Sequence, residues 1–267
     1  MPDLETAARF RALHDGPGPL LLPNPWDAGS ALVFERLGFQ ALATTSNGFA
    51  LSHGLPDGAI TRDGVFEGIE MIVQATSLPV TADLEHGFEE DAAALADVYR
   101  QAVAAGLAGG SIEDATGADE KPLFEIAEAA DRVRIAAEAA HEVNPAFVLT
   151  GRAENYLHGL RDLGDVIARL QAYQEAGADV LYAPGLSGAA DIRSVIESVD
   201  RPINVLFGPA HLTVAELAEL GVARISIGGS FAFAAYGAAA EVAREFLENG
   251  TNTYAALSRA GHAATGL

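Results

Sequence analysis

The chain has 267 residues and a formal net charge of −21, from 37 acidic and 16 basic residues. Such an acidic surface repels nucleic-acid phosphates and anionic lipids. We therefore expect the protein to bind neither nucleic acid nor membranes. The sequence has no cysteine, which excludes disulfides, thiolate metal sites and a cysteine nucleophile. Its first residues are charged and amphipathic, without the apolar stretch of a secretion signal, so we expect a cytoplasmic protein.

Short apolar runs alternate with stretches of helical period along the whole chain. The runs cover residues 20–23, 41–45, 80–83, 109–113, 147–152, 180–183, 203–207 and 224–227. The helical stretches cover residues 30–37, 62–76, 91–105, 123–143, 165–176, 190–199 and 214–220. Such alternation produces right-handed βαβ units with a parallel sheet, and eight units predict a (β/α)8 barrel of the TIM type. An open Rossmann-like sheet is the competitor, but no Gly-x-Gly-x-x-Gly motif follows the first run.

No linker or low-complexity segment divides the chain, so residues 1–267 are predicted to form one α/β domain. Residues 231–267 form a C-terminal extension that reads as two helices around the sequence ENGTNT. We expect one helix to complete the barrel. The extra C-terminal helix is interpreted as a cap or an oligomer contact.

Acidic residues stand at two neighbouring strand ends, where barrel enzymes place their active sites. Asp83 and Glu85 follow the third run, and Glu113 ends the fourth. Three converging carboxylates repel one another unless a cation lies among them. Oxygen ligands without cysteine or a histidine pair favour Mg²⁺ or Mn²⁺ over Zn²⁺. The alternative is that these acids cap the helices that follow.

Arg152 is the only basic residue at the end of a predicted strand. A guanidinium fork suits the carboxylate of a small acid, although a structural ion pair with the strand-end acids is the alternative. The segment TTSNG, residues 44–48, offers a hydroxyl and backbone N–H groups for a carboxylate, a weak signal by itself. Asn204, at the seventh strand end, is a further candidate for substrate binding.

Several segments, in order, resemble the phosphoenolpyruvate mutase/isocitrate lyase superfamily. They are NPWDAGSA, ATTSNG, GLPDG, TADLEHGF, GGSIED, GRAEN and GADVLYAPG, and the likeness spans roughly residues 20–231. The resemblance implies a barrel that binds Mg²⁺ and a small anionic 2-oxo acid, and that breaks or forms a bond next to an enolate. It also implies a homodimer or homotetramer in which the last helix is exchanged between subunits.

The resemblance implies roles for individual residues as well. Asp83 is expected to bind the metal directly, with Glu85 and Glu113 as water-mediated partners and Asp57 behind them. The substrate carboxylate is expected on Ser46 and on the backbone N–H groups of Asn47 and Gly48, with Arg152 as its second anchor. Catalytic parts are assigned to Arg152, Asp57 and Glu113.

The sequence also departs from the family. Isocitrate and methylisocitrate lyases carry a Lys-Lys-Cys-Gly-His-type motif on a long loop after the IED strand, whereas the loop here reads ATGADEKPLFEIA and has no cysteine. Mutase and phosphonopyruvate hydrolase members place a lysine on this loop, where Lys121 is the only candidate and is poorly placed. Thr44 replaces an aromatic residue before the serine motif, which leaves Trp26 as the nearest lid aromatic.

These departures leave chemistry that needs a metal and carboxylate anchors but little protonation machinery. The sequence therefore predicts a Mg²⁺-dependent lyase or decarboxylase of a small 2-oxo or 2-hydroxy acid, acting through an enolate. A base for a substrate hydroxyl would come from His53, His86, Glu154, Tyr156 or His158, although a structural role is more usual for a lone histidine. A phosphonopyruvate-type mutase or hydrolase and a non-catalytic 2-oxo-acid-binding protein are the alternatives.

Overall fold

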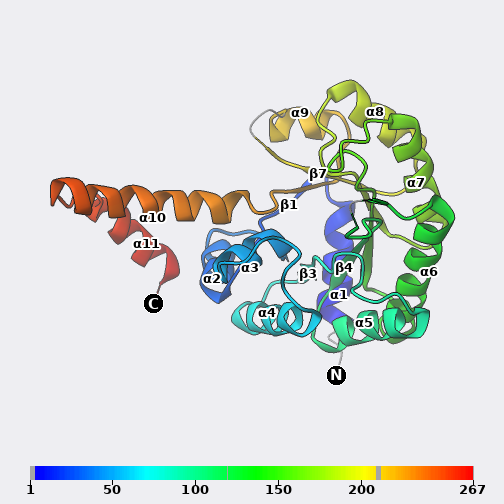
Figure 1. Ribbon diagram of the computed structural model, residues 1–267, viewed down its shortest axis with the longest axis horizontal. Helices are drawn as coiled ribbons and strands as arrows, with labels where there is room; N and C mark the ends of the chain where they lie inside the picture. The colour runs from blue at the N-terminus through cyan, green and yellow to red at the C-terminus, as the bar shows by residue number, and fades with distance from the viewer. Residues whose placement is uncertain (1–3, 119, 209–211, 267) are drawn as a thin grey trace.

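The computed structural model describes residues 4–118, 120–208 and 212–266 (Figure 1). In this part of the chain, eight parallel strands form one sheet in the order β1-β8-β7-β6-β5-β4-β3-β2. The two edges meet where the N–H of Ala43 donates to the carbonyl oxygen of Pro23 at 3.1 Å. The side-chain amide of Asn24 also donates to the carbonyl oxygen of Thr44 at 3.0 Å. The predicted (β/α)8 barrel is therefore confirmed.

Every strand lies within a run predicted from the sequence. The strands are β1 Leu20–Leu22, β2 Leu42–Ala43, β3 Val80–Ala82, β4 Gly109–Glu113, β5 Val148–Arg152, β6 Val180–Tyr182, β7 Ile203–Leu206 and β8 Arg224–Ser226. The seven predicted helices are present with ends shifted by a few residues. They are α2 Ala28–Arg36, α4 Arg62–Ala75, α5 Ala92–Ala104, α6 Ile126–Val143, α7 Leu163–Glu175, α8 Ala189–Ser198 and α9 Val214–Glu219.

Side-chain caps explain why several of these helices begin where they do. Asp27 caps α2 in a capping box with Ser30, and Thr213 caps α9 in the same way. Asp91 accepts from two backbone N–H groups at the start of α5, and Asp162 does so at the start of α7. Each cap gives partners to N–H groups that the first helical turn leaves free.

Two α-helices of the described residues were not among those predicted. Helix α3 (Ser46–Ser52) follows β2, in a segment expected to be a loop. Helix α1 (Leu4–Ala12) precedes the barrel and buries Ala7 and Phe10 completely. These two side chains pack in one cluster with residues at the N-terminal ends of the strands, among them Leu20, Val148 and Val180. Helix α1 therefore closes the end of the barrel opposite the C-terminal ends of the strands.

Next to α1, a 3₁₀ helix (Leu13–Asp15) carries His14, whose titration we expect to affect stability. Burial, and then the charge of Arg224, lower the pKa of His14 to about 4. The unfolded chain takes up a proton as pH falls below about 6.5, before the folded protein does, so stability should decrease between pH 6.5 and pH 4. Because the ring is only partly buried, we expect a loss of roughly 2 kcal/mol, detectable as a fall in the urea midpoint.

The variant His14→Gln keeps a donor for the carbonyl oxygen of Phe10, which His14 Nδ1 contacts at 3.0 Å, but does not titrate. Its stability should fall less steeply than that of the wild type over this pH range. Equal slopes for the two proteins would show that His14 does not carry the effect.

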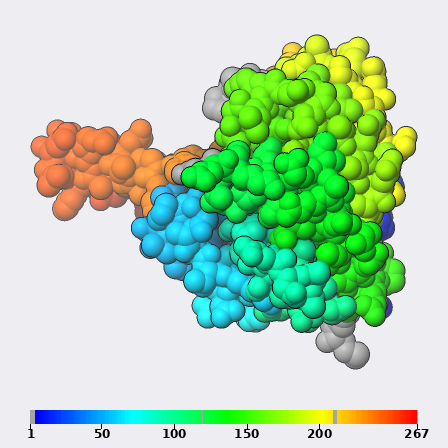
Figure 2. Space-filling view, turned by 45° about the vertical axis from the view of Figure 1, so that its right-hand side comes forward, coloured from blue at the N-terminus to red at the C-terminus, as the bar shows by residue number. Residues whose placement is uncertain are grey.

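The C-terminal extension consists of α10 (Ser230–Asn249) and α11 (Ala255–Thr265), in agreement with the two predicted helices. Helix α10 projects away from the barrel (Figures 1 and 2), and α11 turns back from its far end toward α2 (Figure 1). Neither helix completes the ring around the barrel, so that expectation was wrong. An apolar hollow of about 150 Å³ remains over β1 and β8, lined by Leu21, Phe39, Val214, Ile225, Phe231 and neighbouring residues. In the described part of the chain, no single helix is both long enough and apolar enough to cross a bilayer.

Candidate active site

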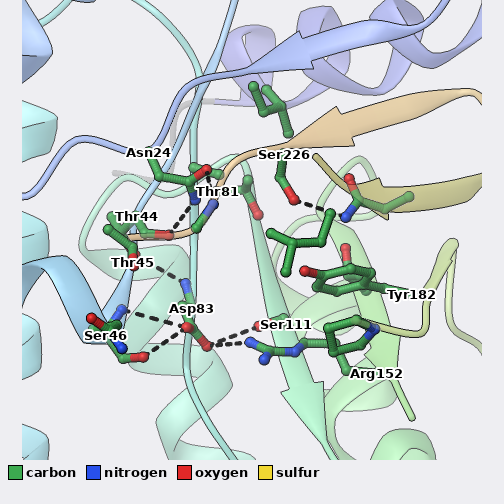
Figure 3. A pocket seen from close by; sticks show the side chains of 18 of the residues that line it. Asn24, Thr44, Thr45, Ser46, Thr81, Asp83, Ser111, Arg152, Tyr182 and Ser226 are labelled. Carbon is green, nitrogen blue, oxygen red and sulfur yellow. Dashed lines mark hydrogen bonds and ion pairs between the residues drawn. The ribbon is translucent and has the colours of Figure 1, made fainter. Parts of the chain in front are cut away.

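A cavity of about 210 Å³ lies at the C-terminal ends of the strands and extends into the barrel (Figure 3). Bulky apolar side chains usually fill the inside of such barrels. Here small polar residues from four strands, Thr81, Ser111, Thr150 and Ser226, line the cavity instead. At about 30 Å³ for each water molecule, the space suits a small acid better than a nucleotide.

Asp83 lines the cavity immediately after β3. Its backbone N–H donates to Thr44 Oγ1 at 3.0 Å. The hydroxyl of Ser46 donates to one carboxylate oxygen at 3.0 Å, and Arg152 Nη1 donates to the other at 2.8 Å. Figure 3 shows Asp83 between these two side chains. The structure therefore brings together three residues that were predicted from different strand ends.

Arg152, the last residue of β5, is surrounded by carboxylates. It forms ion pairs with Asp83, Glu113 and Glu154 at 2.8, 3.1 and 3.0 Å, and its side chain is only 14% exposed. The guanidinium also lies over the ring of Tyr182, 5.3 Å from the ring centre. These acids engage most of its five N–H donors, so Arg152 forms the ion pairs that the sequence left open as an alternative.

Three carboxyl groups share this single guanidinium. Burial raises the pKa of Glu113 well above its usual value, although Arg152 opposes the shift. Burial also raises the pKa of Glu154, and it raises that of Glu85 to about 7 with help from the charges of Asp83 and Asp57. Carboxyl groups resist ionisation in this way when burial removes them from water and nearby cations do not fully compensate. An additional cation at this site would favour the ionised forms of these carboxyl groups.

The donor set fits a hard divalent cation bound mainly through water. Among the described residues, no three acidic or histidine side chains converge as a ready metal cage. Of the predicted trio, Asp83 lines the cavity, whereas Glu85 and Glu113 do not. Glu85 begins the turn after β3 with a φ of 49°. Mg²⁺ commonly keeps several waters and takes only one or two carboxylates, which is compatible with Asp83 as the direct ligand.

Several groups of the segment TTSNG, which was predicted to bind a carboxylate, already have hydrogen-bond partners within the protein. Ser46 and Asn47 line the cavity, as does Asp57, which accepts from the Asn47 side-chain amide at 3.1 Å. Gly48 does not line it, and its N–H donates to Thr45 Oγ1 at 3.3 Å as part of the cap of α3. A Cβ on Gly48 would lie 2.7 Å from Thr45 Cγ2, so close packing explains this glycine.

Asn204 lines the cavity as predicted, but its side chain already has protein partners. Its oxygen accepts from Arg224 Nε at 3.0 Å, and its amide donates to Ser226 Oγ at 2.9 Å. Asn204 therefore holds Arg224 in place, and Arg224 was not among the predicted site residues.

None of the five candidate bases belongs to the cavity wall that the described residues form. They are His53, His86, Glu154, Tyr156 and His158. Lys121 is exposed and pairs with Glu128 at 3.4 Å, and Trp26 packs against Phe34 instead of lining the cavity. The wall does include Tyr182, whose pKa burial raises to about 12. Tyr182 is therefore a neutral hydrogen-bond donor at ordinary pH.

A buried network behind the cavity positions Glu154. Asp114, 2% exposed, accepts the N–H of Glu154 at 2.8 Å. Its other oxygen accepts from Arg169 at 3.0 Å and from the Tyr173 hydroxyl at 2.5 Å. Because Glu154 contacts Arg152, this network fixes the charged cluster from the side opposite the cavity.

Comparison with known proteins places the chain in a family. The family model of phosphoenolpyruvate phosphomutase matches residues 10–247. A curated but uncharacterized protein of Mycobacterium tuberculosis is 34% identical over 88% of this chain and 87% of its own. The 2-methylisocitrate lyase of Escherichia coli is 34% identical over 73% of this chain and 67% of its own. A crystal structure from Burkholderia cenocepacia, described only as a lyase/mutase, is 49% identical with a TM-score of 0.91, covering 94% of this chain and 91% of the other.

Two more distant similarities concern the chemistry. An oxaloacetate decarboxylase of Bradyrhizobium is 29% identical over 81% of this chain and 73% of its own. A phosphonopyruvate hydrolase solved with oxalate and Mg²⁺ is 26% identical with a TM-score of 0.85, covering 95% of this chain and 90% of the other. The named relatives thus include carbon–carbon lyases that act on small acids. The chain belongs to the phosphoenolpyruvate mutase/isocitrate lyase superfamily.

Proposed function

We propose that the protein is a Mg²⁺- or Mn²⁺-dependent enzyme that breaks a carbon–carbon bond in a small 2-oxo or 2-hydroxy acid through an enolate. The observation that carries this proposal is the contact of Asp83 with both Ser46 and Arg152, in a cluster where three carboxyl groups share one guanidinium. A bound divalent cation would supply a Lewis acid for the negative charge that develops on the 2-oxo group. Asp83 would hold it, with Glu85 and Glu113 acting through water.

The residues of this chain would mainly bind and orient the substrate. Ser46 and Asn47 line the cavity. The Asn47 amide keeps one N–H beyond its bond to Asp57, whereas the Ser46 hydroxyl can donate to a substrate carboxylate only in exchange for its bond to Asp83. The guanidinium of Arg152 would place positive charge near the same end of the substrate, and its N–H groups that the acids leave free could donate to it. Tyr182, neutral and next to Arg152, can donate to an oxygen that becomes negative. Because candidate bases are absent from the described wall, decarboxylation, which needs little proton transfer from the protein, is the reaction we favour.

A turnover screen tests this proposal. Purified protein would be incubated with oxaloacetate, substituted malates, methylisocitrate or phosphonopyruvate in Mg²⁺ or Mn²⁺, with matched samples in EDTA, and products followed by mass spectrometry. We expect EDTA-sensitive release of a 2-oxo acid from one of the carbon substrates. Cleavage of the phosphonate alone would favour the mutase or hydrolase alternative. Metal-dependent binding without turnover would instead favour a binding protein.

We further propose that α10 and α11 pack against a second copy of this chain. Of the 20 residues of α10, Ala232 is the only one whose side chain is described as buried. Phe246 and Leu247, near its far end, are 68% and 85% exposed. Exposed apolar side chains on a helix that stands clear of its own barrel support a contact with another subunit, and the apolar hollow over β1 and β8 would be the surface that receives them. When each subunit packs its α10 and α11 against a neighbour in this way, the assembly is a homodimer or a homotetramer.

Light scattering after size exclusion checks this assembly. The wild type should elute as a dimer or tetramer, and the double variant Phe246→Glu, Leu247→Glu should shift toward monomer because two buried charges would open the interface. Met71→Glu, an apolar-to-acid change at a 45% exposed position of α4, serves as the matched control and should not change the mass. A monomeric wild type at micromolar concentration would contradict the proposal.

A further inference from the structure

Arg224 shares the inner face of the barrel with Arg152. The register pairs Arg152 with Tyr182, Tyr182 with Asn204, and Asn204 with Arg224. Residues paired in one row of a parallel sheet point to the same side, so both arginines face inward. They lie three strands apart, roughly 14 Å along the curved sheet at about 4.8 Å for each strand. Arg152 ends β5, whereas Arg224 begins β8, which places Arg224 deeper in the barrel.

The side chain of Arg224 lines the cavity, yet only 5% of the residue is exposed. Nε donates to Asn204 and Nη2 to Thr150 Oγ1, each at 3.0 Å. Nη1 is buried and has no hydrogen-bond partner among the described residues. In the same part of the chain, no carboxylate forms an ion pair with Arg224, although the protein has 37 acidic residues. Arg224 is therefore a buried cation held by neutral groups.

A buried cation without a counterion lowers stability unless a bound anion compensates it. Burial, followed by repulsion from Arg152, lowers the pKa of Arg224 to about 10, so it stays charged at neutral pH. His14 does not supply the missing negative charge, because its ring is neutral or positive. A residue with the purely structural role of bridging β5, β7 and β8 would not need a charge, because apolar residues usually fill the inside of such barrels.

We propose that Arg224 is a second anion anchor at the floor of the cavity, which binds the distal carboxylate of a dicarboxylic substrate. The inference rests on the proposed function, in which the first carboxylate lies at the Ser46 and Arg152 end. Thr150 and Asn204 orient the guanidinium, and the cavity between the two arginines is the space for the carbon chain. The preferred substrates are then C4-type diacids, and acids with one carboxylate bind weakly.

Two acids that differ only at the distal group test this anchor. Malate and 2-hydroxybutyrate would be titrated by calorimetry, in Mg²⁺, into the wild type and into Arg224→Met. The wild type should bind malate at least about tenfold more tightly. The variant should lose about 10- to 100-fold in malate affinity, because a charged hydrogen bond is removed, while its affinity for 2-hydroxybutyrate changes less than about threefold.

Two further variants keep the test decisive. Arg224→Lys retains the charge and serves if the methionine variant does not fold; its malate affinity should fall about 3- to 10-fold because an ammonium cannot reproduce the fork. Arg134→Met, which removes an exposed arginine on α6, controls for net charge and should bind like the wild type. Equal losses for both acids in the Arg224 variants, or no loss, would overturn the anchor. A wild type that binds neither acid would overturn the proposed function too, whereas equal binding of both acids would overturn only the role of Arg224.

Discussion

Replacing Arg152 with methionine is expected to lower the free energy of unfolding by about 3–5 kcal/mol, because the change leaves buried acids without their cation. Asp83, Glu113 and Glu154 all lie within 3.1 Å of its guanidinium. Urea unfolding followed by circular dichroism would measure the loss. Arg152→Lys, which keeps a charge, should lose less.

The pH dependence of this variant gives an independent check. The pKa values of Glu113 and Glu154 are already raised, and removing Arg152 would raise them further. Carboxyls with raised pKa values favour the folded state at low pH and weaken it as pH rises through the folded value. The variant should therefore recover part of its stability near pH 5. A loss below about 1 kcal/mol at neutral pH would show that the cluster does not depend on Arg152.

Replacing Asp83 with asparagine is expected to reduce kcat/KM by at least about 100-fold on whichever acid the turnover screen identifies. Asparagine retains the size of the side chain and can accept from the Ser46 hydroxyl, but it lacks the charge that would hold the cation. Stability should be unchanged or higher, because the change removes one of three carboxylates that share a single guanidinium. Steady-state kinetics and thermal unfolding would be compared with those of Asp97→Asn, which alters an exposed acid on α5. Activity within threefold of the wild type would remove Asp83 from the catalytic site.

Periodicity was sufficient to predict the barrel, because each strand and each surrounding helix buries a recurrent apolar face. It missed α3, which has seven residues and starts in a segment rich in Ser, Asn and Gly. It also missed the direction of α10. A helix that pairs outside its own domain has the same apolar composition as one that covers the barrel, so sequence alone did not separate the two cases.

The strand-end rule placed Asp83, Ser46 and Arg152 together, but it did not identify Arg224. That rule considers only the C-terminal end of each strand, whereas Arg224 is the first residue of β8. A signal was present in the sequence: Arg224 and Ser226 alternate with Ile225, so polar residues occupy the face that β8 turns inward. The role of Gly48 depends on the cap that Thr45 forms at the start of α3, a contact that the sequence pattern did not indicate.

The most direct test of the proposed function is a calorimetric titration of oxalate into the wild type, once with Mg²⁺ and once with EDTA. Oxalate resembles the enolate of a small 2-oxo acid, and it is bound with Mg²⁺ in the related phosphonopyruvate hydrolase. We expect saturable binding at one site per chain in Mg²⁺, and loss of that binding both in EDTA and in Asp83→Asn. Equal affinity with and without the metal, or in the variant, would contradict a metal-dependent acid site at the strand ends.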